Sequence, residues 1–162
     1  MTTATMEDLQ WKPRLSMFVQ ETFQTMFAMK LKQVEASSCE NLEGNRIVGS
    51  VGFAGAVMGM FYIDLPTELA QTLTTIMLGT ECDTKDGSLV KDVIGELSNI
   101  IGGQLKSYLS DYGLPCVLSI PSITRGSDFH IDPMSGTKRE RFVFHRQGSD
   151  VSVIIYVDVK SE

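Results

Sequence analysis

One predicted helix carries three polar side chains that could take part in catalysis or binding. Asp92, Glu96 and Asn99 are separated by four and then three residues, so they stack along one line of a helix surface. They provide two carboxylates and a carboxamide but no cation able to hold a phosphate, so phosphate chemistry here would have to take its positive charge from elsewhere. The alternative to a site for phosphate chemistry is an ordinary solvated helix face. The spacing of these residues alone does not distinguish a site from a solvated face.

The element that would position these groups is a long amphipathic helix predicted over residues 88–111. Gly103 and Lys106 continue the line of polar positions, and Gly102 and Gly103 each cost roughly 1 kcal/mol relative to alanine in a helix interior. A glycine on the exposed line leaves a shallow spot where another surface can approach the helix. The positions expected to face the core are Val93, Leu97, Ile100, Ile101, Leu105 and Tyr108.

The other periodic segments predict an α+β fold, with helices packed on an antiparallel sheet. A first helix is expected from Pro13 to about Gln33, and a second is expected to open at Pro66 and Thr67 and to stop at Gly79. The positions expected to face inward are Leu15, Phe18, Val19, Phe23, Met26 and Phe27 in the first helix, and Leu69, Leu73, Ile76, Met77 and Leu78 in the second.

Strand patterns surround these helices. Residues 47–53 and 56–64 predict one hairpin, and residues 139–147 and 150–159 predict another. Residues 116–124 read as a strand whose Pro121 indicates an edge or a bulge. Helix plus hairpin thus occurs twice, over 14–64 and 88–159, which indicates a pseudo-twofold duplication.

The length of the chain favours a single domain, and its acidic composition argues against binding to nucleic acid or anionic membranes. The chain has 162 residues, and we expect a polar lead-in over 1–12 and a single domain over 13–162. With 20 acidic and 14 basic residues, the surface would repel nucleic acid and anionic membranes, so the expected partner is a protein or a small molecule. No export signal or membrane span is predicted, and we expect a cytoplasmic protein.

Other candidate chemistry is weak. Cys39, Cys82 and Cys116 are too far apart to predict a disulfide framework or a zinc site. Ser98 has no nucleophile elbow around it, and His130 with Asp132 provides only two ligands on a loop, so we expect no metal site. The closely spaced glycines at 49, 52, 55 and 59 lie within a strand pair and are interpreted as turn or bulge glycines instead of a phosphate loop.

Residues 90–109, VKDVIGELSNIIGGQLKSYL, resemble the signature helix of the CheC/CheX family of bacterial chemotaxis phosphatases. That motif is an Asp or Ser, three residues, a Glu, two residues and an Asn, here Asp92, Glu96 and Asn99. The resemblance is closest to the CheX type and extends to Gly95, Gly103 and Lys106, to the hairpin and helix upstream, and to the proline-containing strand at 118–126. This chain departs from the family at Gly87-Ser88, where an acidic pair is common, and at Val93, where a smaller residue is common.

The resemblance implies a phosphatase that acts on a phosphorylated response regulator of the CheY kind. Asn99 would hold a water in line with phosphorus, Glu96 would pair with the lysine beside the regulator's phosphate, and Asp92, Gly103 and Lys106 would contact the partner. The regulator would supply Mg²⁺, and the chain would need no cofactor of its own. A homodimer is also implied, with the C-terminal strands as a route for pairing.

Two other function classes remain open. One is a non-catalytic module that binds a response regulator or resembles the flagellar switch proteins, and the other is a small-molecule binding domain. Within the catalytic interpretation, Glu21 and Gln24 repeat the three-residue spacing on the first helix. Because glutamine is longer than asparagine and bulky residues follow it, we expect one active site per chain, in the second half.

Overall fold

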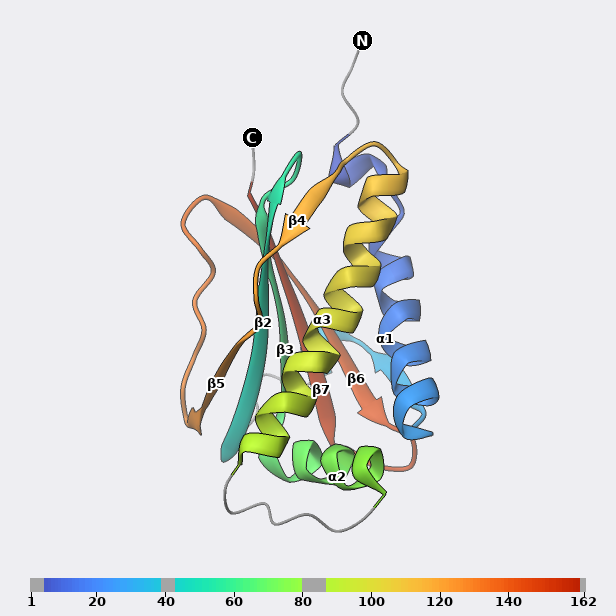
Figure 1. Ribbon diagram of the computed structural model, residues 1–162, viewed down its shortest axis with the longest axis vertical. Coiled ribbons are helices and arrows are strands. Elements are labelled where there is room, and N and C mark those ends of the chain that lie inside the picture. Colours follow the sequence, from blue (N-terminus) through green and yellow to red (C-terminus); the bar gives the residue numbers. More distant parts are fainter. Residues whose placement is uncertain (1–4, 39–42, 80–86, 161–162) are drawn as a thin grey trace.

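In the part of the chain that the structure describes, seven antiparallel strands form one sheet, and three α-helices pack against it (Figure 1). The structure is a computed structural model that describes residues 5–38, 43–79 and 87–160. The helices are α1 (Trp11–Phe27), α2 (Thr67–Leu78) and α3 (Ser88–Asp111), with short 3-10 turns η1 (Met6–Asp8) and η2 (Ala36–Ser38). The strands are β1 (Leu31–Val34), β2 (Asn45–Gly55), β3 (Gly59–Pro66), β4 (Cys116–Leu118), β5 (Ser122–Ser127), β6 (Thr137–Arg146) and β7 (Ser152–Lys160). The predicted α+β class is confirmed.

The strand order reveals an internal pseudo-twofold arrangement. The sheet runs β1-β6-β7-β3-β2, and β4 and β5 both pair with the outer edge of β2. The first half of the chain therefore reads α1-β1-β2-β3, and the second half reads α3-β4/β5-β6-β7. β3 and β7 pair at the centre, and the outermost strand of each half joins the other half's hairpin. This order has the symmetry that the repeated helix-plus-hairpin pattern predicted.

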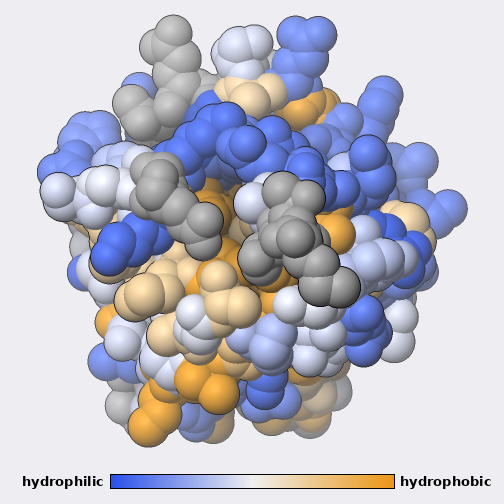
Figure 2. Space-filling model, turned by 90° about the horizontal axis from the view of Figure 1, so that it is seen from above, coloured by the Kyte–Doolittle hydropathy of each residue, from blue (hydrophilic) through white to orange (hydrophobic). Residues whose placement is uncertain are grey.

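One face of the sheet carries most of the core. Alternate residues of β2, β3, β6 and β7 point to this face and are buried, among them Ile47, Val51, Phe61, Ile63, Phe144, Ile155 and Val157. α1 and α3 lie side by side across it in opposite directions, while α2 covers one end (Figure 1). Seen from the end that carries both termini, much of the visible surface is hydrophilic, with smaller apolar areas between (Figure 2).

The opposite face of the sheet buries charged groups in pairs. Arg46 contacts Asp64 at 3.1 Å, and Arg139 binds Asp158 through two nitrogen atoms at 2.7 and 2.9 Å. The segment between β5 and β6 reaches this face, because the Arg139 guanidinium donates to the Ile131 carbonyl and Arg46 lies 4.4 Å from the ring centre of Phe129. The sheet is thus covered on both sides along its middle strands.

The structure corrects the predicted end of the first helix. α1 stops at Phe27 because Ala28 adopts a left-handed conformation (φ 49°) and its N–H donates to the Gln24 carbonyl. The chain then enters β1, which pairs with β6, where the sequence pattern had predicted helix to about Gln33. The helix also starts before Pro13, and Met6 and Trp11 are buried in the core, so part of the predicted lead-in packs against the domain.

Two further expectations were wrong: that the last residues of the second helix face the core, and that the C-terminal strand has a free edge. In α2 the bounds agree with the prediction, including the left-handed Gly79 cap, but Ile76, Met77 and Leu78 are 40–46% exposed. Because the helix lies across one end of the sheet, its Ala70 and Thr74 are buried instead. β7 is an interior strand between β3 and β6, so it has no free edge for pairing with a second subunit, and the homodimer stays a prediction.

No helix within the described residues is both long enough and apolar enough to cross a membrane. Cys39 and Cys82 lie outside the described residues, and Cys116 is buried with a free thiol.

Candidate functional site

The long helix α3 spans Ser88–Asp111, the bounds that its periodicity predicted. Gly87 precedes it in a left-handed conformation (φ 73°), and its carbonyl accepts the first helical hydrogen bond from Lys91. More residues of α3 are buried than the sequence pattern predicted. Five of the six predicted core positions are buried and Ile100 is half-exposed, whereas Val90, Ile94, Ser98, Gly102 and Leu109 are buried in addition.

α3 sits unusually close to the sheet at one point, where Ser98 faces Gly49 of β2. A Cβ atom added to Gly49 would lie 2.1 Å from Ser98 Oγ and 3.1 Å from Ile94 Cγ2, so only glycine fits. The Ser98 hydroxyl donates to the Ile94 carbonyl at 2.7 Å, which fixes its orientation. Because Asn99 follows Ser98 directly, this contact sets the height of the candidate site above the sheet. Sequence reasoning had assigned Gly49 to a turn or bulge, and its pairing within β2 shows that this assignment was wrong.

The structure brings the predicted chemical groups together on the outer line of α3. Asp92, Glu96 and Asn99 are all exposed, and none of the three has a hydrogen-bond or ion-pair partner within the part of the chain that the structure describes. An added Cβ on Gly103 would meet no described atom within 4 Å apart from the neighbouring backbone of α3 itself, which agrees with the predicted shallow spot. The line therefore presents a carboxylate and a carboxamide, one turn apart, to an incoming surface.

Lys106 lies at the end of this line but is half-buried. It borders a small hollow with Leu118 and Cys116, and its charge opposes the burial that raises the pKa of the Cys116 thiol. Its ammonium group therefore lies on the β4 side of the helix. Its predicted contact with a partner stays a prediction.

Two neighbouring elements hold α3 from the sides. On one side, Thr22 of α1 donates to the Gln104 side chain at 3.3 Å, and Phe18 packs edge-on against Tyr108 with ring centres 6.3 Å apart. On the other side, the β4–β5 strand follows the helix, and Ile123 would lie 4.0 Å from a Cβ added to Gly95. The exposed line of α3 is thus a ridge between α1 and the edge of the sheet.

The part of the chain that forms this site is similar to a known protein family. Residues 47–145, which include all of α3, match the family described as chemotaxis phosphatase CheX. The chain belongs to the CheX family. The resemblance drawn from the signature helix is confirmed.

Relatives of known identity extend the CheX match over most of the chain. The "CheY-P phosphatase CheX" of Thermotoga maritima is 24% identical over 136 residues, which cover 78% of this chain and 88% of the relative. The crystal structure of chemotaxis protein CheX from Vibrio vulnificus has a TM-score of 0.80 at 20% identity and covers 94% of this chain and 97% of that one. The CheX chain of a CheX-CheY-BeF3-Mg²⁺ complex from Borrelia burgdorferi has a TM-score of 0.72 at 18% identity and covers 94% and 99%. The two structures show the CheX fold.

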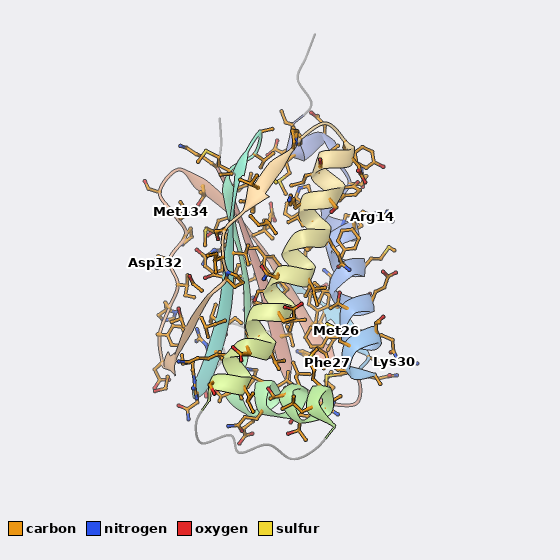
Figure 3. All side chains as sticks on the ribbon, viewed as in Figure 1. Arg14, Met26, Phe27, Lys30, Asp132 and Met134 are labelled. Carbon is orange, nitrogen blue, oxygen red and sulfur yellow. The ribbon has the colours of Figure 1, made fainter. Side chains whose placement is uncertain are left out.

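The competing candidate residues do not form a site in this CheX-family chain. Ser98 is buried and its hydroxyl is bonded to a helix carbonyl. Asp132 lies on the segment between β5 and β6, on the far side of the view from α1 (Figure 3), and both it and His130 are exposed. Within residues 5–38, 43–79 and 87–160, no three His, Cys, Asp or Glu side chains gather as metal ligands.

The first helix offers Glu21 and Gln24 in a different setting. Both are exposed, as predicted, and they line an open depression of about 440 Å³ at the C-terminal end of α1. Lys30, at that end of the helix (Figure 3), and Lys32 line the same depression. A partner that brings a lysine and a metal ion would meet positive charge here, whereas no basic side chain lies on the turn between Glu96 and Asn99.

Proposed function

We propose that this chain hydrolyses the aspartyl phosphate of a CheY-like response regulator. The observation that supports this most is the exposed pair of Glu96 and Asn99 on α3, which has no partner among the described residues, in a member of a chemotaxis phosphatase family. The name of the Thermotoga relative and the CheY complex of the Borrelia relative support the choice of substrate.

In the proposed mechanism, the Asn99 carboxamide holds a water molecule in line with the phosphorus atom. A carboxamide both donates and accepts hydrogen bonds, so it can orient a water without first removing its proton. The water oxygen forms a bond to phosphorus as the bond between phosphorus and the aspartyl oxygen breaks, and both water protons leave with inorganic phosphate as dihydrogen phosphate. The regulator's aspartate is regenerated as a carboxylate, and no covalent intermediate forms on this chain.

Glu96 has a different role, which is to pair with the lysine beside the regulator's phosphate. The regulator also supplies Mg²⁺, so the positive charge that Glu96 and Asn99 do not provide comes with the substrate. Asp92 extends the acidic side of the contact by one turn. Gly103 leaves room for the regulator's backbone, and Lys106 borders the contact on the β4 side.

The decisive test is turnover by Asn99→Ala on a CheY-type receiver domain phosphorylated with acetyl phosphate. We expect a loss of about 2–4 kcal/mol of transition-state stabilisation, or roughly 30-fold to 1,000-fold in rate, with binding within a few-fold of the wild type. Folding should not suffer, because Asn99 has no hydrogen-bond or ion-pair partner among residues 5–38, 43–79 and 87–160, and alanine favours the helix.

Ser107→Ala is the matched control, since Ser107 is exposed on the same helix two turns away and should leave turnover unchanged. Full turnover by Asn99→Ala would refute the mechanism. A wild-type chain that binds the phosphorylated receiver without hydrolysis would instead identify the non-catalytic binding module.

A further inference from the structure

The strand edge beside the α3 line contains a β-bulge. β4 pairs with β2 up to Leu118 opposite Phe53, and β5 resumes the pairing with Ser122 opposite Ser50. Between these two pairs β2 has two residues and the other strand has three, residues 119–121, so one residue has no counterpart. Bulges of this kind change the direction of a side chain and are frequent beside active sites.

The bulge is anchored at its base and exposes one large apolar side chain. The Ser119 N–H donates to the Gly52 carbonyl, and the Gly52 N–H donates to Ser119 Oγ, both at 2.8 Å. The next residue, Ile120, is 87% exposed, more than any other large hydrophobic side chain in the described ranges. A well-ordered backbone therefore supports an isoleucine that packs against almost nothing in this chain.

The position of Ile120 is beside the candidate site. Pro121, its neighbour, would lie 4.0 Å from a Cβ added to Gly95, and Leu118 would lie 4.0 Å from a Cβ added to Gly102. Gly95, Asn99 and Gly102 follow one another at helical spacing, with Asn99 turned furthest to solvent. The bulge thus borders α3 at the height of Asn99.

We propose that Ile120 is an apolar anchor that binds the phosphorylated response regulator next to its phosphorylation site, an inference that rests on the function proposed above. The bulge continues the proposed contact surface, and it adds an apolar group to a line that otherwise offers a carboxylate and an amide. Most of the binding energy of an interface comes from a few side chains that become fully desolvated in a pocket of the partner, and Ile120 is exposed enough to enter such a pocket. At the bulge itself a second copy of this chain fits poorly as an added strand, because residues 119–121 and Pro121 interrupt the N–H groups that strand pairing requires.

Val117 provides a matched control on the same strand. It is 67% exposed and lies opposite Ala54, which alternates along β2 with the buried, helix-facing Phe53. Val117 therefore points to the sheet face away from α3. Ile120→Ser and Val117→Ser each remove an exposed apolar side chain, but only the first lies beside Asn99.

The experiment compares both variants with the wild type in two measurements. In steady-state hydrolysis of an acetyl-phosphate-charged CheY-type receiver domain, Ile120→Ser should raise KM about tenfold, equivalent to about 1.4 kcal/mol, and leave kcat within twofold. In titrations with the receiver activated by BeF₃⁻ and Mg²⁺, its Kd should rise by the same factor. Val117→Ser should match the wild type in both.

The outcomes separate this inference from the proposed function. Wild-type KM and Kd in Ile120→Ser would overturn the anchor while leaving hydrolysis intact. Wild-type binding without turnover would refute the phosphatase, and the Kd comparison would still decide the anchor. A wild type that neither binds nor hydrolyses would overturn both. If light scattering shows that Ile120→Ser dissociates a dimer and the Kd is unchanged, the residue contacts a second copy and the inference is wrong.

Discussion

Gly49→Ala should disturb the candidate site from beneath, without touching any group on its surface. The new Cβ would lie 2.1 Å from Ser98 Oγ, and ordinary contact begins at 3.4 Å, so the two atoms must separate by about 1.3 Å. The Ser98 hydroxyl can rotate away only by giving up its hydrogen bond to the Ile94 carbonyl. Overpacking of this kind typically costs about 1–3 kcal/mol of stability.

The same displacement should also lower the rate of phosphate hydrolysis. If α3 relaxes outward by on the order of 1 Å, Asn99 moves with it, and a misplacement of that size can reduce turnover about a hundredfold. Stability would be measured by urea unfolding, followed through the fluorescence of Trp11, the single tryptophan, which is buried in the core. Turnover would be measured on the phosphorylated receiver domain where the variant remains folded.

Two further variants test whether the close contact between position 49 and Ser98 causes the expected loss of stability. Adding Ser98→Ala to Gly49→Ala removes the atom in closest conflict and should recover most of the lost stability, because the remaining neighbours lie at 3.1 and 3.3 Å. Gly103→Ala, where an added Cβ meets nothing, should instead gain up to about 1 kcal/mol. A Gly49→Ala variant as stable and active as the wild type would refute the reasoning.

Three other predictions concern charge and the second motif. Glu96→Ala should weaken receiver binding as well as turnover, with a defect that shrinks as salt rises, and normal binding at low salt would exclude the proposed lysine contact. Glu21→Ala/Gln24→Ala should keep more than half of wild-type turnover, whereas a tenfold fall without unfolding would reveal a second working site. Burial raises the pKa of Asp64 to about 6 against the opposing charge of Arg46. The folded chain thus holds a proton that the unfolded chain releases, so between about pH 3 and 7 the free energy of unfolding should fall with rising pH, by about 3 kcal/mol in total, relative to Asp64→Asn.

The sequence predicted the features that depend on local periodicity. The bounds of α3 and the exposure of Asp92, Glu96 and Asn99 follow from an amphipathic repeat that continues over more than six turns. The two hairpins were equally predictable, because their strands alternate clearly and are joined by short turns. The chemistry proposed for the exposed line rests on the family resemblance and stays a prediction, since a carboxylate and an amide at helical spacing are common on solvated faces.

Features that depend on distant segments could not be read from the pattern. β1 was predicted as helix because Leu31 continues the apolar spacing of α1, and only its pairing with β6 makes it a strand. The close contact between Gly49 and Ser98 joins residues from separate halves of the chain. Pro121 did indicate an edge or a bulge, but the exposure of Ile120 follows from how β4 and β5 both register against β2.

The arrangement around α3 explains how Glu96 and Asn99 could take part in catalysis with no basic side chain on the turn between them and, within the described residues, no cluster of metal ligands. Its buried side is fixed at three points, by Gly49 below, by Thr22 on α1 and by Ile123 on β5, so the positions of Glu96 and Asn99 are determined before any partner arrives. Preorganised groups lose little entropy when the partner binds. The entropy of orienting the reacting groups is the part of the activation free energy that positioning can lower. In the proposed reaction the regulator brings the charge that stabilises the transferred phosphoryl group. This chain then has to supply geometry alone, and a change that moves α3 should therefore be as damaging to turnover as a change in the exposed side chains themselves.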